Sequence, residues 1–138
     1  MSPTEPWFAG HLRELTRDEC LELLATKSVG RVAYCTPDGP EVLPLNYVVD
    51  DGTLLFRTSP HSALGRQLRL GVAAFQVDDV DDYTESGWSV LVRGNVEPVS
   101  TDDLPPASRR PRPWVGGVRP LHLRLTPRTV TGRRLLPG

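Results

Sequence analysis

The sequence predicts a mainly β protein, a six-stranded antiparallel β-barrel of Greek-key type with a few short helices. Much of the chain alternates apolar and polar residues with a period of two, which is typical of half-buried strands. Tight-turn residues separate the first three strand segments, so these strands form an antiparallel meander. A closed barrel is the arrangement expected for six such strands, because closure leaves no exposed edge.

The length of 138 residues suits a single domain, residues 1–138, which buries a core without a metal or a disulfide. Cys20 and Cys35 match neither a CxxC motif nor a zinc-site spacing, and this favours reduced, buried cysteines. No apolar run is long enough to span a membrane, and residues 1–7 lack the basic and apolar regions of a signal peptide. We therefore expect a cytoplasmic protein without a membrane partner.

The net charge of −1 is distributed unevenly along the chain. Residues 1–100 hold eight basic and fifteen acidic groups, whereas residues 101–138 hold eight arginines and two acidic groups. The planar arginine side chain suits phosphate or carboxylate, so this segment either meets an acidic ligand or packs against the acidic part of its own or a partner chain. A near-neutral total without a dense basic stripe disfavours a nucleic-acid partner.

The N-terminal residues 1–15 are predicted to form an extended arm that leads into a helix. Thr16 is a suitable N-cap, and Glu19 follows it at the spacing of a capping box. The residues that recur at helical intervals and predict the buried face are Leu21, Leu24 and Ala25.

Three strands are predicted after this helix, over residues 29–35, 42–49 and 53–58. Residues 37–40, Pro-Asp-Gly-Pro, form the turn between the first two strands. Asp51-Gly52 joins the second and third strands and is a strong signal for a tight hairpin.

A short helix is predicted next, because Ser59 is a good N-cap and Pro60 is favoured at the first helical position. Leu64 and Leu68 would form its apolar face, and the helix would end near Gly71.

The fourth strand is predicted over residues 72–77 and the fifth over residues 87–99. Gly94 and Pro98 mark a bulge or a bend in the fifth strand. The acidic run 78–82 lacks the ligand spacing of an EF-hand loop, so we interpret it as a solvated loop.

The C-terminal part begins with the proline- and arginine-rich residues 100–117, predicted as a short helix followed by a loop. Residues 121–126 alternate leucine with polar residues and predict the sixth strand. Pro127 is expected to end this strand, and residues 129–135 add a last short strand.

The enzyme motifs GxSxG and HExxH and the Walker loop do not occur in the sequence. His11, His61 and His122 lie far apart, and His122 falls on the polar face of a strand. We interpret all three as surface or packing residues and expect no metal site. The sequence identifies no catalytic side chain.

One segment, residues 57–62, has the composition of an anion site. A strand end leads here into a predicted helix start, where unpaired N–H groups favour phosphate. Thr58, Ser59 and Ser62 offer hydroxyl groups, and Arg57 and Arg66 offer charge. The alternative is an ordinary capped helix with an arginine on either side.

Several short motifs occur in one order along the chain, at residues 29–33, 42–47, 52–58, 75–78, 86–94 and 123–134. Together they resemble the pyridoxamine 5′-phosphate oxidase-like family with the FMN-binding split barrel, particularly its small actinobacterial members. The resemblance covers about residues 15–136. It implies a homodimer that binds two FMN molecules at its interface.

The resemblance also implies roles for individual residues. Those expected to line the isoalloxazine ring, chiefly through their backbone, are Pro44, Leu45, Asn46 and Tyr47. Those expected to hold the ribityl phosphate are Arg57, Thr58, Ser62 and Leu64. Those expected to close the site, from the same or the partner chain, are Trp88 and Ser89, with further contributions from Trp114 and Arg133 or Arg134.

The sequence departs from the family where a lysine often follows the third strand, because His61-Ser62-Ala63 stands there. The sole lysine, Lys27, lies in the first helix, and Arg66 is the candidate to replace the missing charge. No basic set for the phosphate of pyridoxamine 5′-phosphate is visible, so true pyridoxamine 5′-phosphate oxidase activity is not expected.

The leading functional hypothesis is an FMN-dependent oxidoreductase that acts on a small molecule, with the flavin carrying the chemistry. A second hypothesis keeps the fold and replaces FMN with the deazaflavin F420. A third is a flavin or haem carrier or sensor without catalysis. Fold alone does not decide among them.

Overall fold

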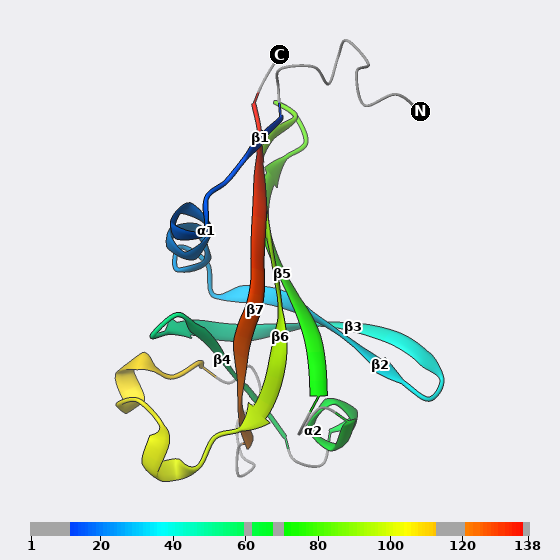
Figure 1. Ribbon diagram of the computed structural model, residues 1–138, viewed down its shortest axis with the longest axis vertical. Coiled ribbons are helices and arrows are strands. Elements are labelled where there is room, and N and C mark those ends of the chain that lie inside the picture. Colours follow the sequence, from blue (N-terminus) through cyan, green and yellow to red (C-terminus); the bar gives the residue numbers. More distant parts are fainter. Residues whose placement is uncertain (1–11, 60–61, 68–70, 113–120, 137–138) are drawn as a thin grey trace.

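Six antiparallel strands close into a ring in the computed structural model, which describes residues 12–59, 62–67, 71–112 and 121–136 (Figure 1). The helices and strands are β1 (Leu12–Glu14), α1 (Arg17–Leu24), β2 (Val29–Thr36), β3 (Gly39–Asp50), β4 (Thr53–Thr58), α2 (Ala63–Gln67), β5 (Gly71–Asp81), β6 (Ser86–Pro98) and β7 (Leu121–Leu135). Two single turns of 3₁₀ helix, Thr101–Asp103 and Ala107–Arg109, lie between β6 and β7.

The order of strands around the ring is β7-β4-β3-β2-β5-β6, and β6 pairs again with β7. This confirms the predicted mainly β fold and is consistent with a split barrel. The arm predicted over residues 1–15 contains a short strand that the sequence did not reveal, because β1 has only three residues. β1 extends the sheet by pairing with the end of β7, with Leu12 opposite Leu135. Residues 1–11 lie outside the described part.

Helix α1 begins with the predicted capping box. Thr16 Oγ1 accepts a hydrogen bond from Glu19 N at 3.2 Å, and Glu19 Oε1 accepts one from Thr16 N at 3.0 Å. Its buried residues are Cys20 and Leu24, whereas Ala25 is exposed at the C-cap. A Cβ atom added at Gly132 of β7 would lie 2.6 Å from Cys20 Sγ, so α1 packs closely against this strand.

The predicted meander of β2, β3 and β4 is present. Asp51 and Gly52 have φ angles of 50° and 75°, so both adopt the left-handed conformation that a two-residue hairpin needs. Cys35 of β2 is exposed, in contrast to Cys20, so the prediction that both cysteines are buried is wrong for Cys35. Its strand has one face outside the barrel, and Cys35 lies on that face.

The acidic run 78–82, predicted as a solvated loop, belongs mostly to β5, which continues to Asp81. The backbone of β6 pairs with this part of β5 as far as Asp81, which lies opposite Ser86. The β5–β6 hairpin is therefore longer than the low strand propensity of aspartate indicates. Asp79 also forms an ion pair with Lys27 at 2.8 Å. The loop prediction is therefore wrong for most of this run.

Strand β7 is continuous through Pro127, which was predicted to end it. Gly94 of β6 lies opposite Pro127 and Arg93 lies opposite Thr129, so Arg128 is an extra residue in β7. Proline is tolerated at such a β-bulge, where the regular ladder of hydrogen bonds is interrupted. The predicted bulge at Gly94 is confirmed, and the predicted break at Pro127 is wrong.

The barrel interior holds the main core. Tyr47, Phe56 and Phe75 form its aromatic centre, with ring centroids 5.1 Å apart for Tyr47 and Phe75 and 5.9 Å apart for Phe56 and Phe75. The segment predicted as a helix and loop over 100–117 contains the two 3₁₀ turns, and residues 113–117 lie outside the described part. Within the described residues, no helix combines the length and apolar character needed to cross a membrane.

Candidate functional site

The hydroxyl groups predicted to hold phosphate lie at the end of β4 and the start of α2. Ser62 Oγ donates to Ser59 O at 2.7 Å, accepts from Gly65 N at 2.9 Å and lies 2.9 Å from Thr58 Oγ1. A hydroxyl group has one hydrogen, so Thr58 is the donor toward Ser62. Because α2 begins directly after Ser62, Ser62 caps it; the prediction of Ser59 as the cap is wrong, and Pro60 lies outside the described residues.

The other residues predicted near α2 have different surroundings. Leu64 is almost fully buried, and its side chain belongs to the core cluster. Arg66 is exposed in the last turn of α2, and its backbone N donates to Ser62 O at 3.0 Å. Leu68, predicted on the apolar face of this helix, lies outside the described residues.

Strand β4 places Arg57 and Thr58 on opposite faces, because successive side chains of a strand alternate. Phe56 lies in the core, so Thr58 shares the inner face and Arg57 lies on the outer face. Arg57 pairs in register with His122 of β7. The structure therefore brings Thr58 together with Ser62, and it brings Arg57 together with His122.

The outer face of β3, β4 and β7 carries a row of three polar residues. Tyr47 of β3 lies opposite Phe56 of β4, and the next residues on these strands are Asn46 and Arg57. His122 continues this row on β7. Asn46, Arg57 and His122 are thus neighbours on one surface, although they come from three strands.

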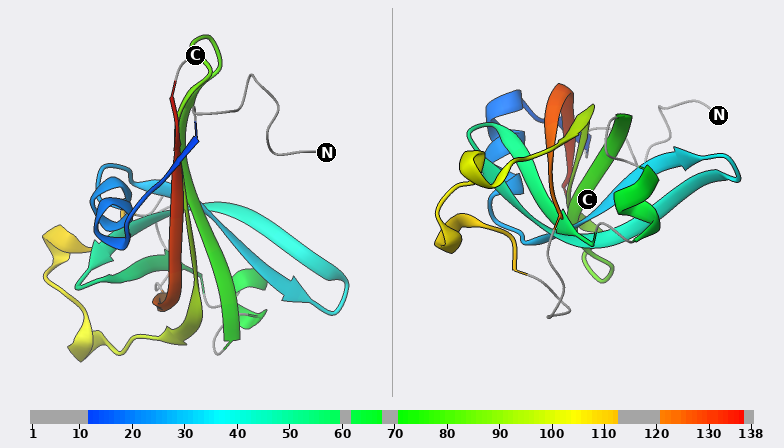
Figure 2. Two further views of the ribbon diagram at one scale, coloured as in Figure 1. Left: turned by 45° about the horizontal axis from the view of Figure 1, so that its top comes forward. Right: turned by 90° about the horizontal axis from the view of Figure 1, so that it is seen from below.

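The segment 99–112 covers this surface, running out from the end of β6 and returning alongside β3 and β4 (Figures 1 and 2). Val99 N donates to His122 O at 2.9 Å, and Asn46 Nδ2 donates to Arg112 O at 2.6 Å. Leu55 lies on the same outer face and is fully buried, which shows that the cover excludes solvent there.

Two buried polar atoms of this row, Asn46 Oδ1 and His122 Nε2, have no hydrogen-bond partner within the described residues. His122 is 7% exposed. Burial lowers the pKa of His122, and the positive charges of Arg57 and Arg110 lower it further. The imidazole is therefore neutral at neutral pH. Buried groups normally find partners, so these atoms mark a place that can receive a ligand.

The sequence predicted His122 to be a surface or packing residue, and its burial was missed. The alternation of residues 121–126 correctly separates His122 from the leucines of the core. The cover that buries it comes from segment 99–112, which no local pattern connects with β7. A buried imidazole beside Arg57 and Arg110 is a property of the tertiary structure alone.

Of the four residues predicted to line the flavin ring, Tyr47 has its side chain in the core. Its hydroxyl group donates to Leu24 O at 2.5 Å, and burial raises the pKa of this hydroxyl. Pro44 is exposed, Leu45 is half-buried, and Asn46 has the buried acceptor described above. Pro44 and Asn46 thus lie on the outer face of β3, whereas Leu45 packs against the core on the same inner face as Tyr47.

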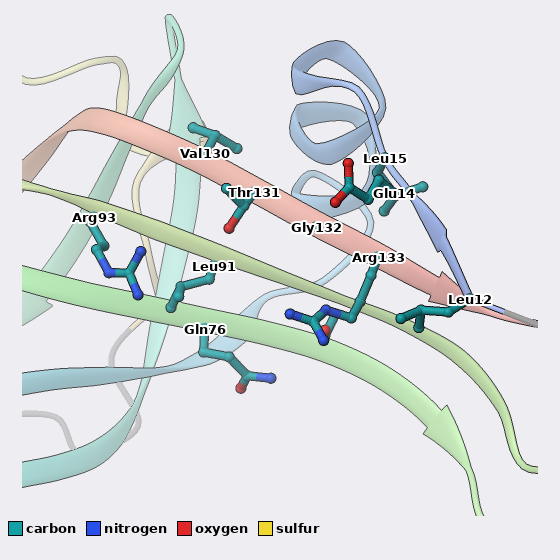
Figure 3. Close-up of a pocket in the computed structure, with 11 residues that line it drawn as sticks. Leu12, Glu14, Leu15, Gln76, Leu91, Arg93, Val130, Thr131, Gly132 and Arg133 are labelled. Atoms are coloured by element: carbon teal, nitrogen blue, oxygen red, sulfur yellow. The ribbon is translucent and has the colours of Figure 1, made fainter. Parts of the chain in front are cut away.

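A separate pocket of about 680 Å³ lies on the outer side of β5, β6 and β7, beside β1 (Figure 3). Gln76, Leu91 and Arg93 project into it from the same side of the sheet. The other lining residues are Leu12, Glu14, Leu15, Ser89, Val130, Thr131, Gly132 and Arg133. The sequence could have placed the β6 lining residues Ser89, Leu91 and Arg93 on one outer face, because they alternate with buried residues such as Val90.

Trp88 and Ser89, predicted to close the site together, lie on opposite faces of β6. Trp88 belongs to the core cluster, whereas Ser89 lines the pocket. Arg133 also lines the pocket, and the neighbouring Arg134 is half-buried opposite Trp88. Trp114 lies outside the described residues.

The pocket and the polar row lie at opposite ends of β7. Ser89 is in register with Arg133 and Arg57 with His122, and residues 122–133 of an extended strand span up to about 36 Å. One protomer therefore does not bring Ser89 near Arg57.

Comparison with known proteins gives the same fold assignment. A relative in Mycobacterium tuberculosis, the uncharacterized protein Rv0080, is 32% identical over 146 residues, which cover 99% of this chain and 96% of that protein. A crystal structure from Corynebacterium glutamicum has a TM-score of 0.77 and 29% identity, covering 94% of this chain and 96% of that chain.

Two structures from Mycobacterium smegmatis are described by the groups that they bind. The FAD binding protein has a TM-score of 0.71 and 30% identity, covering 90% of this chain and 98% of that chain. The FAD and haem binding protein has a TM-score of 0.71 and 17% identity, covering 93% of this chain and 76% of that chain, and it shows the shared fold alone. The sequence profile of the pyridoxamine 5′-phosphate oxidase family matches residues 16–134. The chain belongs to the pyridoxamine 5′-phosphate oxidase family, as its motifs predicted.

Proposed function

We propose that this protein is a flavoprotein that binds FMN beside Asn46 and Arg57 and acts as an oxidoreductase on a small molecule. The observation that carries the proposal is Asn46 Oδ1, a buried acceptor without a donor among the described residues. Asn46 belongs to the segment that resembles the ring-binding segment of the family. The isoalloxazine ring has an N–H group, which is the kind of donor that this acceptor lacks.

The surrounding residues fit the other parts of the cofactor. Arg57 is half-buried and takes part in none of the four ion pairs found among the described residues, so its charge is available for a phosphate. FMN and FAD share the ring, the ribityl chain and the first phosphate. Asn46 and Arg57 would therefore meet the same groups in either cofactor, and the FAD binding relative supports flavin binding by this fold.

The chain's own residues would bind and orient the cofactor. Asn46 Nδ2 is held by Arg112 O at 2.6 Å, so Oδ1 has a fixed direction before a ligand arrives. Pro44, which is exposed on the same outer face of β3 as Asn46, offers apolar surface to a flat ring. The flavin, when bound, supplies hydride or electron transfer, and the protein positions it and excludes water.

The proposal includes a homodimer with the cofactor at its interface. The outer faces of β3, β2 and β5 meet in one row, with Val42 opposite Ala33 and Ala33 opposite Ala74. Val42 and Val72, at the margins of this row, are each 59% exposed. A continuous apolar strip of this kind favours burial against a second copy. The family resemblance implies that Ser89 closes the site, and since one protomer does not bring Ser89 near Arg57, a second copy would have to supply it.

The absorption spectrum of the purified protein, before and after incubation with FMN, tests this proposal. An oxidised-flavin spectrum that stays with the protein through gel filtration is expected. A deazaflavin spectrum would instead support F420, and a haem Soret band would support the carrier or sensor hypothesis. Protein that emerges colourless after incubation with FMN or FAD would contradict the flavin proposal.

A further inference from the structure

The cluster of Arg57, Arg110 and His122 contains two groups, Arg110 and His122, that the flavin proposal does not use. We propose that these three side chains form a binding site for an oxyanion, the phosphate or carboxylate group of a ligand. The site lies on the outer face of β4 and β7, under segment 99–112, and is separate from the Thr58–Ser62 hydroxyl pair on the inner face.

Backbone or side-chain contacts hold each member of the cluster. Arg57 and His122 are register neighbours on β4 and β7. His122 is further held by the hydrogen bond from Val99 N to its carbonyl oxygen. Arg110 follows the second 3₁₀ turn, and its Nε donates to Pro105 O at 2.6 Å. That bond holds the guanidinium group, and within the described part of the chain its terminal NH₂ groups have no acceptor.

The charges of the cluster are not balanced by the described residues. Both arginines are half-buried, and the acidic groups that form ion pairs are taken by other cations: Glu19 by Arg13, Asp79 by Lys27, Asp78 by Arg31 and Asp50 by Arg124. Both arginines lie near enough to His122 for their charges to act on it, and cations that are partly removed from water are unfavourable without an anion nearby. A phosphate or carboxylate group accepts hydrogen bonds from several guanidinium N–H groups at once.

His122 provides the independent sign of a ligand. Its side chain is more than nine-tenths buried, and Nε2 has no partner among the described residues. A neutral imidazole with its hydrogen on Nε2 is a donor, and an oxyanion held by the two arginines supplies the missing acceptor. In the ligand-free protein, burial and the positive surroundings disfavour a charged imidazole, so the site offers an oxyanion two cations and one neutral donor.

Two sources of the oxyanion share this chemistry. One is the phosphate of the flavin, and this case rests on the proposed function. The other is a phosphate or carboxylate group of a small-molecule substrate, and this case does not depend on the proposed flavin binding. Arg110 and His122 would then select for anionic substrates.

Phosphate-dependent thermal stabilisation and flavin selectivity test the proposal on the full chain. The variants are Arg110→Ala and His122→Phe, and Arg109→Ala is the matched control because it removes an exposed charge one position away. Inorganic phosphate is compared with chloride at equal ionic strength. The wild type and the Arg109→Ala variant are expected to melt at higher temperature in phosphate, and the two site variants to lose this shift.

Affinity for FMN and for riboflavin, which lacks the phosphate, distinguishes the sources. If the site holds the flavin phosphate, the preference for FMN over riboflavin falls about ten- to a hundredfold in Arg110→Ala but not in Arg109→Ala. If the preference is unchanged while the shift with phosphate is lost, the site serves a substrate anion. If the protein binds no flavin but shows the phosphate shift, the flavin proposal fails and the oxyanion site stands. If the two site variants match the wild type in both measurements, the oxyanion proposal is overturned.

Discussion

Gly94 of β6 lies opposite Pro127 of β7, and the two backbones approach so closely that only a residue without a side chain fits. A Cβ atom at Gly94 would lie 2.0 Å from Thr126 O. The bulge at this pair lets β7 run from the polar row at one end to the pocket at the other. The positions of both candidate sites therefore depend on it.

Gly94→Ala should destabilise the protein by about 1–3 kcal/mol, because the new methyl group meets backbone that has to move. Urea unfolding measures the change. Asn95→Ala, at an exposed neighbouring residue, should change the free energy of unfolding by less than about 0.5 kcal/mol. Equal effects of the two variants on the free energy of unfolding would mean that the backbone at the bulge accommodates a methyl group without cost.

Tyr47→Phe should lower the free energy of unfolding by about 1–2 kcal/mol and leave flavin affinity unchanged. The hydroxyl group is buried and donates to Leu24 O, which would lose its partner. Denaturant unfolding and an FMN titration of the same preparation check the two parts. A variant with weaker FMN binding and normal stability would place the Tyr47 hydroxyl in the flavin site instead of the core.

The features predicted correctly are those that a few adjacent residues determine. Thr16 and Glu19 form the capping box that their spacing indicates, and Asp51-Gly52 forms the expected hairpin. Gly94 is an exception: it marks the bulge between β6 and β7, but the contact that requires glycine there comes from Thr126 of β7. The capping box and the hairpin are local properties of backbone conformation, so the sequence alone is sufficient for them.

The features predicted wrongly depend on partners far away in the sequence. Pro127 is compatible with β7 only because Gly94 lies opposite it, and the run 78–82 becomes a strand because β6 pairs with it. In the candidate site, the family motif indicated Asn46 and Arg57, but it gave no sign that His122 is their buried neighbour. That juxtaposition requires three strands and a covering segment.

His122 predicts how stability depends on pH. Its pKa in the folded protein is below the ordinary value of 6.5, so the unfolded chain binds more protons than the folded protein between the two values. The free energy of unfolding therefore keeps the full contribution of neutral His122 above pH 6.5. It decreases as the pH falls from 6.5 toward the pKa of His122 in the folded protein. His122→Phe should flatten the decrease in unfolding free energy as the pH falls from 6.5, measured by urea titration across this range.

The other groups with a lowered pKa or an imidazole do not account for a difference between the wild type and the His122→Phe variant below pH 6.5. The pKa of Glu19 is also lowered, by its hydrogen bonds with Thr16 and Arg13, but its effect is lost only below pH 4.5. His11 and His61 are present in both proteins, and their contributions cancel in the comparison. A slope that is the same with and without His122 would show that its pKa is equal in the folded and unfolded states.

Val72→Glu should convert a homodimer into a monomer. Val72 lies on the proposed interface, where a buried charge without a partner opposes association. Sedimentation at micromolar concentration measures the state of the wild type and the variant. Tyr83→Glu, at a 95% exposed residue in the turn between β5 and β6, should remain dimeric. Wild-type protein that sediments only as a monomer would refute the interface.

Titration of the ligand-free protein with FMN, followed by flavin fluorescence, tests the central claim most directly. We expect saturable binding of one FMN per protomer by the wild type and by Asn95→Leu, a control at an exposed asparagine. Asn46→Leu, which replaces the buried acceptor with an apolar group of similar size, should weaken binding about tenfold, equivalent to about 1.4 kcal/mol. Wild-type protein that leaves the fluorescence of FMN unchanged, or an Asn46→Leu variant that binds FMN as tightly as the wild type, would contradict the claim that Asn46 marks a flavin site.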